Sequence, residues 1–126
     1  MNEIKKIIED LGIAALENNI KIAGVAVISD SGEILYQTEN FDLTNQTSFL
    51  SNVMRGESSF TLNGIEFSIV DKTTEGFVGT NRMGLGHVLI VPFQGGVLVS
   101  YAMSKAEPIQ ALYFLKDFAM KLNRLE

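Results

Sequence analysis

The fold of this chain is decided at residues 60–69, which read FTLNGIEFSI. On each side of Asn63-Gly64, large apolar residues alternate with polar ones, which is the pattern of strands with one buried face. Asn-Gly is the strongest short signal for a hairpin, because a type I′ turn needs positive φ at both central residues. The stretch therefore predicts two antiparallel strands joined by a two-residue turn.

The sequence on either side of this hairpin predicts more short strands. Residues 21–29 and 33–38 are largely apolar and are separated by Asp30-Ser31-Gly32, which predicts a second hairpin. Residues 87–93 and 97–103 flank Gly95-Gly96 in the same way, whereas the glycine-rich residues 76–86 predict a loop or a short strand. Strands joined by tight turns imply a mainly antiparallel sheet.

Helical spacing of apolar residues predicts a helix at each end of the chain. The first covers residues 2–18; its apolar face consists of Ile4, Ile7, Ile8, Leu11 and Ala15. The last covers residues 109–125 after Pro108 in its first turn; its core stripe consists of Leu112, Leu115, Ala119 and Leu122.

A third, shorter helix is predicted within residues 42–55, with Asp42 or Thr44 as its cap and Gly56 as its end. Together these elements predict an α+β fold in which a single central, mainly antiparallel sheet is flanked by N- and C-terminal helices. We expect residues 1–126 to form one domain.

Composition excludes several classes of function. The 126 residues contain no Cys, which excludes disulfides and thiolate metal sites, and the single His leaves no cluster of metal ligands. The formal charge of −5 argues against nucleic acid as a partner. No apolar run is long enough to cross a membrane and the N-terminus lacks the apolar core of a signal peptide, so we expect a cytoplasmic protein.

No arrangement of residues predicts catalysis. His87 begins an apolar strand, and no Gly-x-Ser-x-Gly motif is present. Residues 79–86 resemble a phosphate loop only loosely, because neither Gly-Lys-Ser/Thr nor a helix follows them. The acidic residues are scattered rather than paired. The sequence therefore predicts a protein that is not an enzyme and needs neither cofactor nor metal.

The last predicted helix points instead to a protein partner. Tyr113 and Phe114 lie outside the core stripe, and Ile109 lies between the stripe and these two residues. The helix is therefore apolar on more than one side. Such a helix is either packed between two layers or exposes a contact patch. Packing against the first helix accounts for part of this pattern.

Three sequence motifs in this order resemble the profilin family. Residues 26–41 resemble its first hairpin, G-x-[VI]-W-A-Q-S followed by a phenylalanine turn, and residues 60–67 resemble its L-x-L-x-G-x-K-[YF] motif. Pro108-x-Gln110 resembles the P-G-Q that opens its last helix. The resemblance covers residues 1–126 and implies a non-catalytic protein that binds monomeric actin, covers one end face of actin and so regulates filament assembly.

The resemblance also implies which residues contact actin. They come from the strands of the second half and from the last helix, and are Glu66, Ser68, Ile69, Asp71, Arg82, Gly86, Val88, Glu107, Leu112, Tyr113 and Asp117. It further implies a monomer that is associated with the cytoskeleton.

Departures from the family pattern indicate a divergent profilin of the archaeal, Asgard type. Leu35 stands where the family has tryptophan, and no aromatic residue follows Phe118, so we expect weak or no binding of polyproline. Glu66 and Asp71 stand at positions where the family has basic residues. Because phosphoinositide is an anionic lipid that binds basic residues, it is an unlikely ligand of this chain.

Fold order alone leaves two alternatives open. Roadblock or longin-type modules, which bind a small GTPase and usually dimerise, combine the same kinds of elements. A ligand-sensing PAS-like domain would do so too, and would need a sealed pocket of about 300 Å³ or more.

Overall fold

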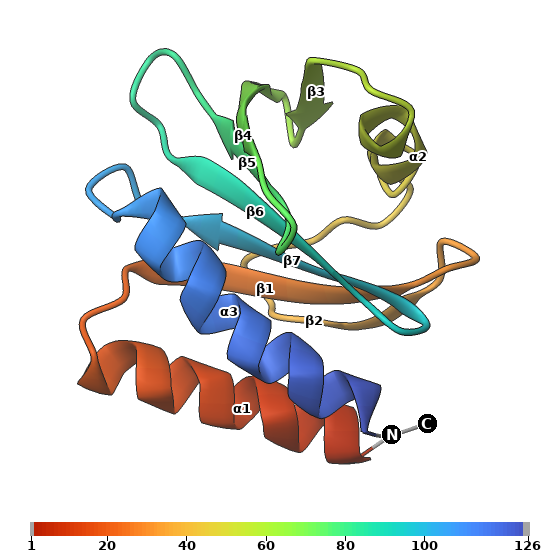
Figure 1. The fold of residues 1–126 in the computed structure, drawn as a ribbon, viewed down its shortest axis with the longest axis vertical. Helices are drawn as coiled ribbons and strands as arrows, with labels where there is room; N and C mark the ends of the chain where they lie inside the picture. Colours follow the sequence, from red (N-terminus) through yellow and green to blue (C-terminus); the bar gives the residue numbers. More distant parts are fainter. Residues whose placement is uncertain (1, 125–126) are drawn as a thin grey trace.

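The computed structural model describes residues 2–124 and contains one seven-stranded sheet with the order β2-β1-β7-β6-β5-β4-β3 (Figure 1). All neighbouring strands are antiparallel, so the predicted α+β arrangement is confirmed. The elements are α1 (Asn2–Glu17), β1 (Ile22–Ser29), β2 (Ile34–Gln37), α2 (Phe49–Met54), β3 (Ser59–Leu62), β4 (Ile65–Lys72), β5 (Phe77–Thr80), β6 (His87–Phe93), β7 (Gly96–Ala102) and α3 (Pro108–Asn123).

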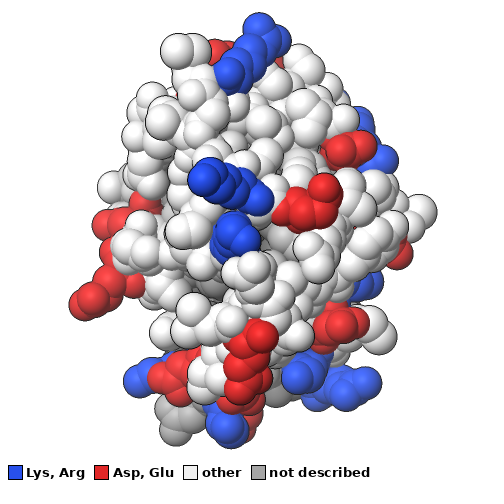
Figure 2. All heavy atoms as spheres, turned by 90° about the vertical axis from the view of Figure 1, so that its left-hand side faces the viewer, with Lys and Arg blue, Asp and Glu red and all other residues white. Residues whose placement is uncertain are grey.

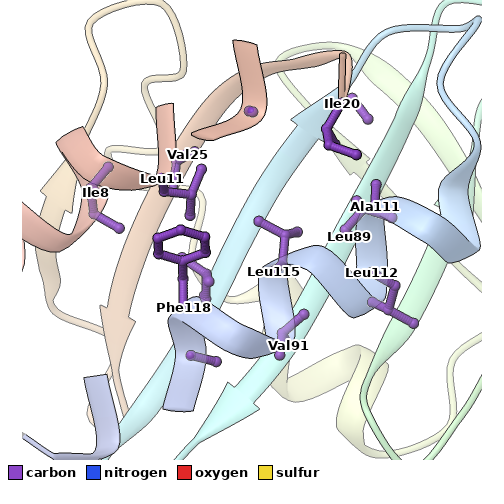
Figure 3. Packing of buried hydrophobic residues seen from close by; sticks show 14 of the residues in the cluster. Ile8, Leu11, Ile20, Val25, Leu89, Val91, Ala111, Leu112, Leu115 and Phe118 are labelled. Carbon is purple, nitrogen blue, oxygen red and sulfur yellow. The ribbon is translucent and has the colours of Figure 1, made fainter. Parts of the chain in front are cut away.

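Both terminal helices cover the same face of the sheet (Figure 1). The predicted stripe of α3 is buried, and Leu115 has no exposed surface. In Figure 3, Phe118 of α3 points towards Leu11 of α1 and Val25 of β1, so α3 packs against both α1 and the sheet. Leu125, the last residue predicted to be helical, lies outside the described residues.

The opposite face of the sheet has its own apolar core, which α2 covers at one end. Phe49 and Val53 of α2 pack there with Phe60 of β3 and Phe67 of β4, and the Phe49 and Phe60 rings stack at 5.1 Å. The central strands β1, β6 and β7 supply side chains to both cores alternately, because successive residues of a strand point to opposite faces.

The hairpin predicted at Asn63-Gly64 is present. Asn63 and Gly64 have φ of 51° and 80°, and Leu62 pairs with Ile65 across the turn. This turn fixes the register of β3 against β4. It thereby determines which residues of β4 face the helices and which face α2.

The start of the short helix differs from the prediction. α2 begins at Phe49, and neither Asp42 nor Thr44 caps it. The Asp42 carboxylate accepts hydrogen bonds from the Thr44 N–H at 2.9 Å and from Gln37 Nε2 at 3.1 Å, so it closes a local turn instead. Hydrogen bonds from Thr44 and then Gln37 hold the pKa of this carboxyl below its usual value.

Candidate protein-interaction surface

The face of the sheet on which α1 and α3 pack carries a row of polar side chains, which runs from β3 to the start of β6. Cross-strand pairing connects Ser59 of β3 to Ser68 of β4, Ser68 to Thr80 of β5, and Thr80 to His87 of β6. Directly opposed residues point to the same face, so these four side chains form one row. α3 packs over β6, β7 and β5, and leaves the β3–β4 end of this face open.

Glu66 and Asp71 of β4 lie on this same open face. Glu66 precedes Ser68 by two residues and is exposed. Beyond Ile69 the pairing shifts by one residue, so that Asp71 rather than Val70 lies opposite Val78 of β5. Because Val78 packs in the core under the helices, Asp71 also faces the side of α3.

Glu107, the N-cap of α3, and Tyr113 and Asp117 within the helix are all exposed. Glu107 caps the helix, since its carboxylate accepts a hydrogen bond from the Ile109 N–H at 3.2 Å. Tyr113 is 52% exposed, whereas the preceding Leu112 is fully buried. The prediction that Leu112 turns inward and Tyr113 outward is therefore confirmed.

His87 is a structural residue at the start of β6. Its Nε2–H donates to the Ser104 carbonyl at 3.3 Å, so Nδ1 accepts from the Thr80 hydroxyl at 2.9 Å. These contacts tie β6 to the connection between β7 and α3. Both ring nitrogens of His87 therefore have hydrogen-bond partners.

Four of the predicted contact residues do not belong to this surface. Ile69 packs on the α2 side of the sheet, because it follows Ser68 and the side chains of a strand alternate. Val88 packs in that same core and is fully buried, and Leu112 lies in the core under α3. Gly86 is also buried, against Tyr101.

The remaining seven predicted residues are at least partly exposed, on β4, on the loop between β5 and β6, and on α3 with its N-cap. They are Glu66, Ser68 and Asp71 from β4, Arg82 from the loop that follows β5, and Glu107, Tyr113 and Asp117 from α3; we call them the α3–β4 surface. The resemblance did not include Thr80, His87 or Val70. Strand alternation could have identified Thr80 and His87, but the bulge that exposes Val70 leaves no mark in the sequence.

On the face that Figure 2 shows, charges are scattered rather than gathered in one basic patch. Figure 2 views the end of the molecule where the β5–β6 loop and the start of α3 lie, and charges of both signs are separated by wide uncharged areas. The α3–β4 surface itself contains four acidic residues and one basic residue, Arg82. A polyanionic ligand therefore has little to bind on it.

Two hollows lie beside α2 or on its side of the sheet, and a third, of about 220 Å³, is lined in part by Glu107 of the α3–β4 surface. Of the first two, one of about 280 Å³ opens on the α2 side of the sheet, between Phe41, Phe67 and Tyr101, and a larger groove of about 670 Å³ runs beside α2. Within residues 2–124, no group of three or more His, Asp or Glu residues could hold a metal ion. No helix in the same part of the chain is long and apolar enough to cross a membrane.

No protein-family model matches this chain. Its sequence is nevertheless similar to that of Loki profilin-1 from Lokiarchaeum sp. (strain GC14_75), at 35% identity in an alignment of 134 residues that covers 98% of this chain and 97% of that protein. It is also 29% identical to Thor profilin from Thorarchaeota archaeon (strain AB_25), over 82% of this chain and 83% of that protein.

Solved structures agree with the sequence comparison. The profilin of a Loki profilin-2 complex with rabbit actin superposes with a TM-score of 0.88 at 31% identity, covering 100% of this chain and 99% of that chain. Acanthamoeba castellanii profilin IB has the same fold at 18% identity, with a TM-score of 0.70 over 83% of this chain and 87% of that chain. Since more than 30% identity extends over nearly the whole length of both sequences, this chain belongs to the profilin family.

Proposed function

We propose that this chain binds an actin monomer through the α3–β4 surface and thereby regulates the assembly of actin filaments. Profilins are a non-enzymatic family of actin-binding proteins, so the proposed function includes no catalytic step. Two profilins similar to this chain, Loki profilin-1 and Loki profilin-2, have been crystallised in complex with rabbit actin.

The observation that carries the proposal is the position of Tyr113. Its side chain is 52% exposed on the outer side of a helix that packs over β5, β6 and β7. A tyrosine in such a place offers a large rigid contact area with a polar tip, and tyrosine is enriched among the residues that dominate binding energy. The polar residues of β4 would form the rim around it.

Occlusion would be the mechanism of regulation. A profilin that covers one end face of an actin monomer blocks addition at that face and leaves the opposite face free. The rate of filament growth then depends on the affinity of the complex and on how fast it dissociates. A protein that works this way would act in the cytoplasm, in association with the cytoskeleton, as a monomer.

Other ligands are less well supported. Leu35 stands where the family has tryptophan and is 42% exposed in a bulge of β2, and the chain contains no Trp, so polyproline would bind weakly or not at all. The acidic α3–β4 surface makes phosphoinositide an unlikely ligand.

The two alternative folds lose their support. A GTPase-binding roadblock or longin-type module was suggested by the order of elements alone, and the sequence similarity extends to profilins instead. The PAS-like alternative needs a sealed pocket, whereas the hollow beside Phe41 and Tyr101 is open.

The test is titration of fluorescently labelled rabbit actin monomers with wild-type protein and with Tyr113→Ala. Tyr113→Ala should weaken binding by about 1–3 kcal/mol, roughly 5- to 150-fold in Kd, on the scale of interface hot spots. Met54→Ala is the matched control, since Met54 is 47% exposed on α2 and lies on the other side of the sheet.

Urea unfolding of the same variants separates binding from folding. Tyr113→Ala should unfold at nearly the wild-type midpoint, because half of its side chain is in solvent. Wild-type protein that does not bind actin would refute the proposed function. Tyr113→Ala that binds like wild type would place the contact surface elsewhere on the molecule.

A further inference from the structure

A groove of about 670 Å³ lies between α2, the β1–β2 turn and the end of the β6–β7 hairpin. Its volume is within the range of about 300–1,000 Å³ that is typical of ligand pockets. In Figure 1 these three segments lie together at one end of the sheet, and the start of α3 lies at the opposite end. None of the residues of the α3–β4 surface lines it. We call it the α2 groove; its lining includes Asp30, Ser48, Leu50, Arg55, Pro92 and Val97.

Hydrogen bonds hold the walls of the α2 groove together. The Asp30 N–H donates to the Gly95 carbonyl at 3.0 Å, which joins the β1–β2 turn to the β6–β7 turn. The Thr47 hydroxyl donates to the Gly32 carbonyl at 3.1 Å, which joins the β1–β2 turn to the segment before α2. The groove is therefore formed before any ligand binds, so that little conformational entropy is lost on binding.

The lining of the α2 groove is apolar in its middle. Leu50 and Val97 are each 8% exposed, and half-buried Pro92 pairs with Val97 across the β6–β7 hairpin. Phe93 is the sole aromatic residue among those that line the groove, and it packs against the core under the helices. The groove therefore offers contact to aliphatic side chains and lacks the aromatic faces on which a polyproline II helix stacks.

One acidic and one basic side chain lie at opposite ends of the α2 groove. The Thr47–Gly32 hydrogen bond places the β1–β2 turn, and with it Asp30, beside the start of α2, whereas Arg55 is the C-cap at the end of α2. Both charged side chains are exposed, and neither forms an ion pair within residues 2–124. The groove is therefore complementary to a ligand that carries both signs of charge, one at each end.

The separation of the two ends fits an extended peptide. Ser48, the N-cap of α2, and Arg55, its C-cap, are about 10 Å apart along a helix that rises about 1.5 Å per residue. An extended chain rises about 3.3 Å per residue, so residues about three positions apart span the same distance. The Ser48 hydroxyl makes no cap hydrogen bond in α2, so it is available to the main chain of such a peptide.

We propose that the α2 groove binds an extended segment of a partner protein in which two or three residues, mostly aliphatic, separate a basic residue from an acidic one. The basic residue pairs with Asp30 and the acidic residue with Arg55, while the aliphatic side chains contact Leu50 and Val97. Because the groove and the α3–β4 surface share no residue, this inference does not depend on the proposed function.

The first test titrates the full chain into fluorescently labelled peptides with blocked ends and follows their anisotropy. The two probes are Gly-Lys-Leu-Ala-Leu-Glu-Gly and the reverse order, Gly-Glu-Leu-Ala-Leu-Lys-Gly, so that both chain directions are covered. One of them should bind about fivefold or more tightly than Gly-Gln-Leu-Ala-Leu-Gln-Gly, which lacks the two ion pairs. If neither probe binds more tightly than the uncharged peptide, the inference is overturned.

The second test exchanges the charges of the groove. Arg55→Glu should weaken binding of the preferred peptide about fivefold or more, and Asp30→Lys/Arg55→Glu should prefer the peptide of reverse order. Lys5→Glu is the matched control, since it changes the net charge equally on an exposed position of α1. All three variants should unfold in urea like wild type, because the replaced side chains are exposed.

The outcomes distinguish this inference from the proposed function. If wild-type protein binds the charged peptide but not actin, the proposed function is refuted and the inference stands. If it binds actin but neither charged peptide, only the inference is refuted. If Arg55→Glu and Lys5→Glu weaken peptide binding equally, the peptide responds to net charge alone and the α2 groove is not its site.

Discussion

Leu112 and Tyr113 are adjacent in α3 and have opposite environments. They are separated by about 100° around the helix axis, so a helix that packs on the sheet with Leu112 must turn Tyr113 away from it. Leu112 is fully buried and Tyr113 is half exposed. One residue therefore contributes to stability and its neighbour remains available for a partner.

Leu115 is the residue of α3 whose loss should cost the most stability. It is fully buried between α3 and the sheet, near Leu89 and Val91 (Figure 3). Leu115→Ala should lower the free energy of unfolding by about 2–5 kcal/mol, because transfer energy is lost and a cavity remains. Urea unfolding measures this change.

Leu16→Ala is the control for that substitution. The same atoms are removed from a side chain that is 85% exposed, so the free energy of unfolding should change by less than about 0.5 kcal/mol. Equal effects of the two substitutions would mean that α3 does not pack on the sheet through Leu115.

Single residues also show where reasoning from the sequence failed. Ile69 and Val88 were assigned to the actin-binding surface by resemblance, position by position, without regard to strand alternation. Ser68 and Ile69 cannot face the same side of β4, and Val88 shares the α2-side core with Ile69. The alternation was visible in the sequence and would have excluded both.

At the scale of elements, the strongly patterned segments were predicted well. The spacing of apolar residues placed α1 and α3 within a residue or two of their ends, and Asn63-Gly64 placed the β3–β4 turn. Residues 76–86 were ambiguous, because β5 has four residues and takes its stability from β4 and β6 on either side. Such tertiary pairing leaves little local pattern.

The start of α2 was mispredicted for a different reason. Asp42 and Thr44 are good capping residues, but they also form turns within their own segment. The hydrogen bond between the Thr44 N–H and the Asp42 carboxylate satisfies this tendency before the helix begins. Only the structure shows that these residues form a local turn and do not cap the helix.

The β5–β6 connection depends on Gly86 more than on Gly84. Gly86 has a φ of 137°, and a Cβ atom there would also lie 2.7 Å from the Ala102 carbonyl oxygen. Gly86→Ala should therefore destabilise the fold by about 3 kcal/mol or more, through backbone strain and overpacking together.

Gly84→Ala provides the comparison within the same connection. Gly84 has a φ of 81°, and a Cβ atom there would meet nothing within 4 Å, so the substitution should cost only about 1 kcal/mol of backbone strain. Thermal or urea unfolding of both variants measures the difference. If Gly86→Ala were no worse than Gly84→Ala, the packing of Tyr101 against the connection would be wrong.

At the scale of the whole molecule, the sheet separates two apolar cores, and different helices cover its two faces. The core under α1 and α3 positions Tyr113 and leaves the β3–β4 end of that face open, whereas α2 and its core close one end of the other face. The resemblance predicted this architecture, which the structure confirms. It could not predict the backbone conformation of residues 82–85, which depends on their hydrogen bonds with Asn81 and Tyr101.

The whole molecule should bind polyproline poorly. Leu35 of β2 stands in place of the family tryptophan, no Trp is present in the chain and no aromatic residue follows Phe118, so the residues on which the family stacks a polyproline II helix are missing. A polyproline peptide should bind with a Kd in the high-micromolar range or weaker when titrated by NMR. A Trp-bearing profilin serves as the positive control, and a low-micromolar Kd for this chain would contradict the prediction.

The most direct test of the central claim is amide hydrogen exchange of the full chain with and without a saturating excess of rabbit actin monomers. If the α3–β4 surface binds actin, exchange should slow in β4, in the loop between β5 and β6 and in α3, and should remain unchanged in α2 and in the β1–β2 turn. Protection confined to α2 and that turn, or no protection at any actin concentration, would contradict the account.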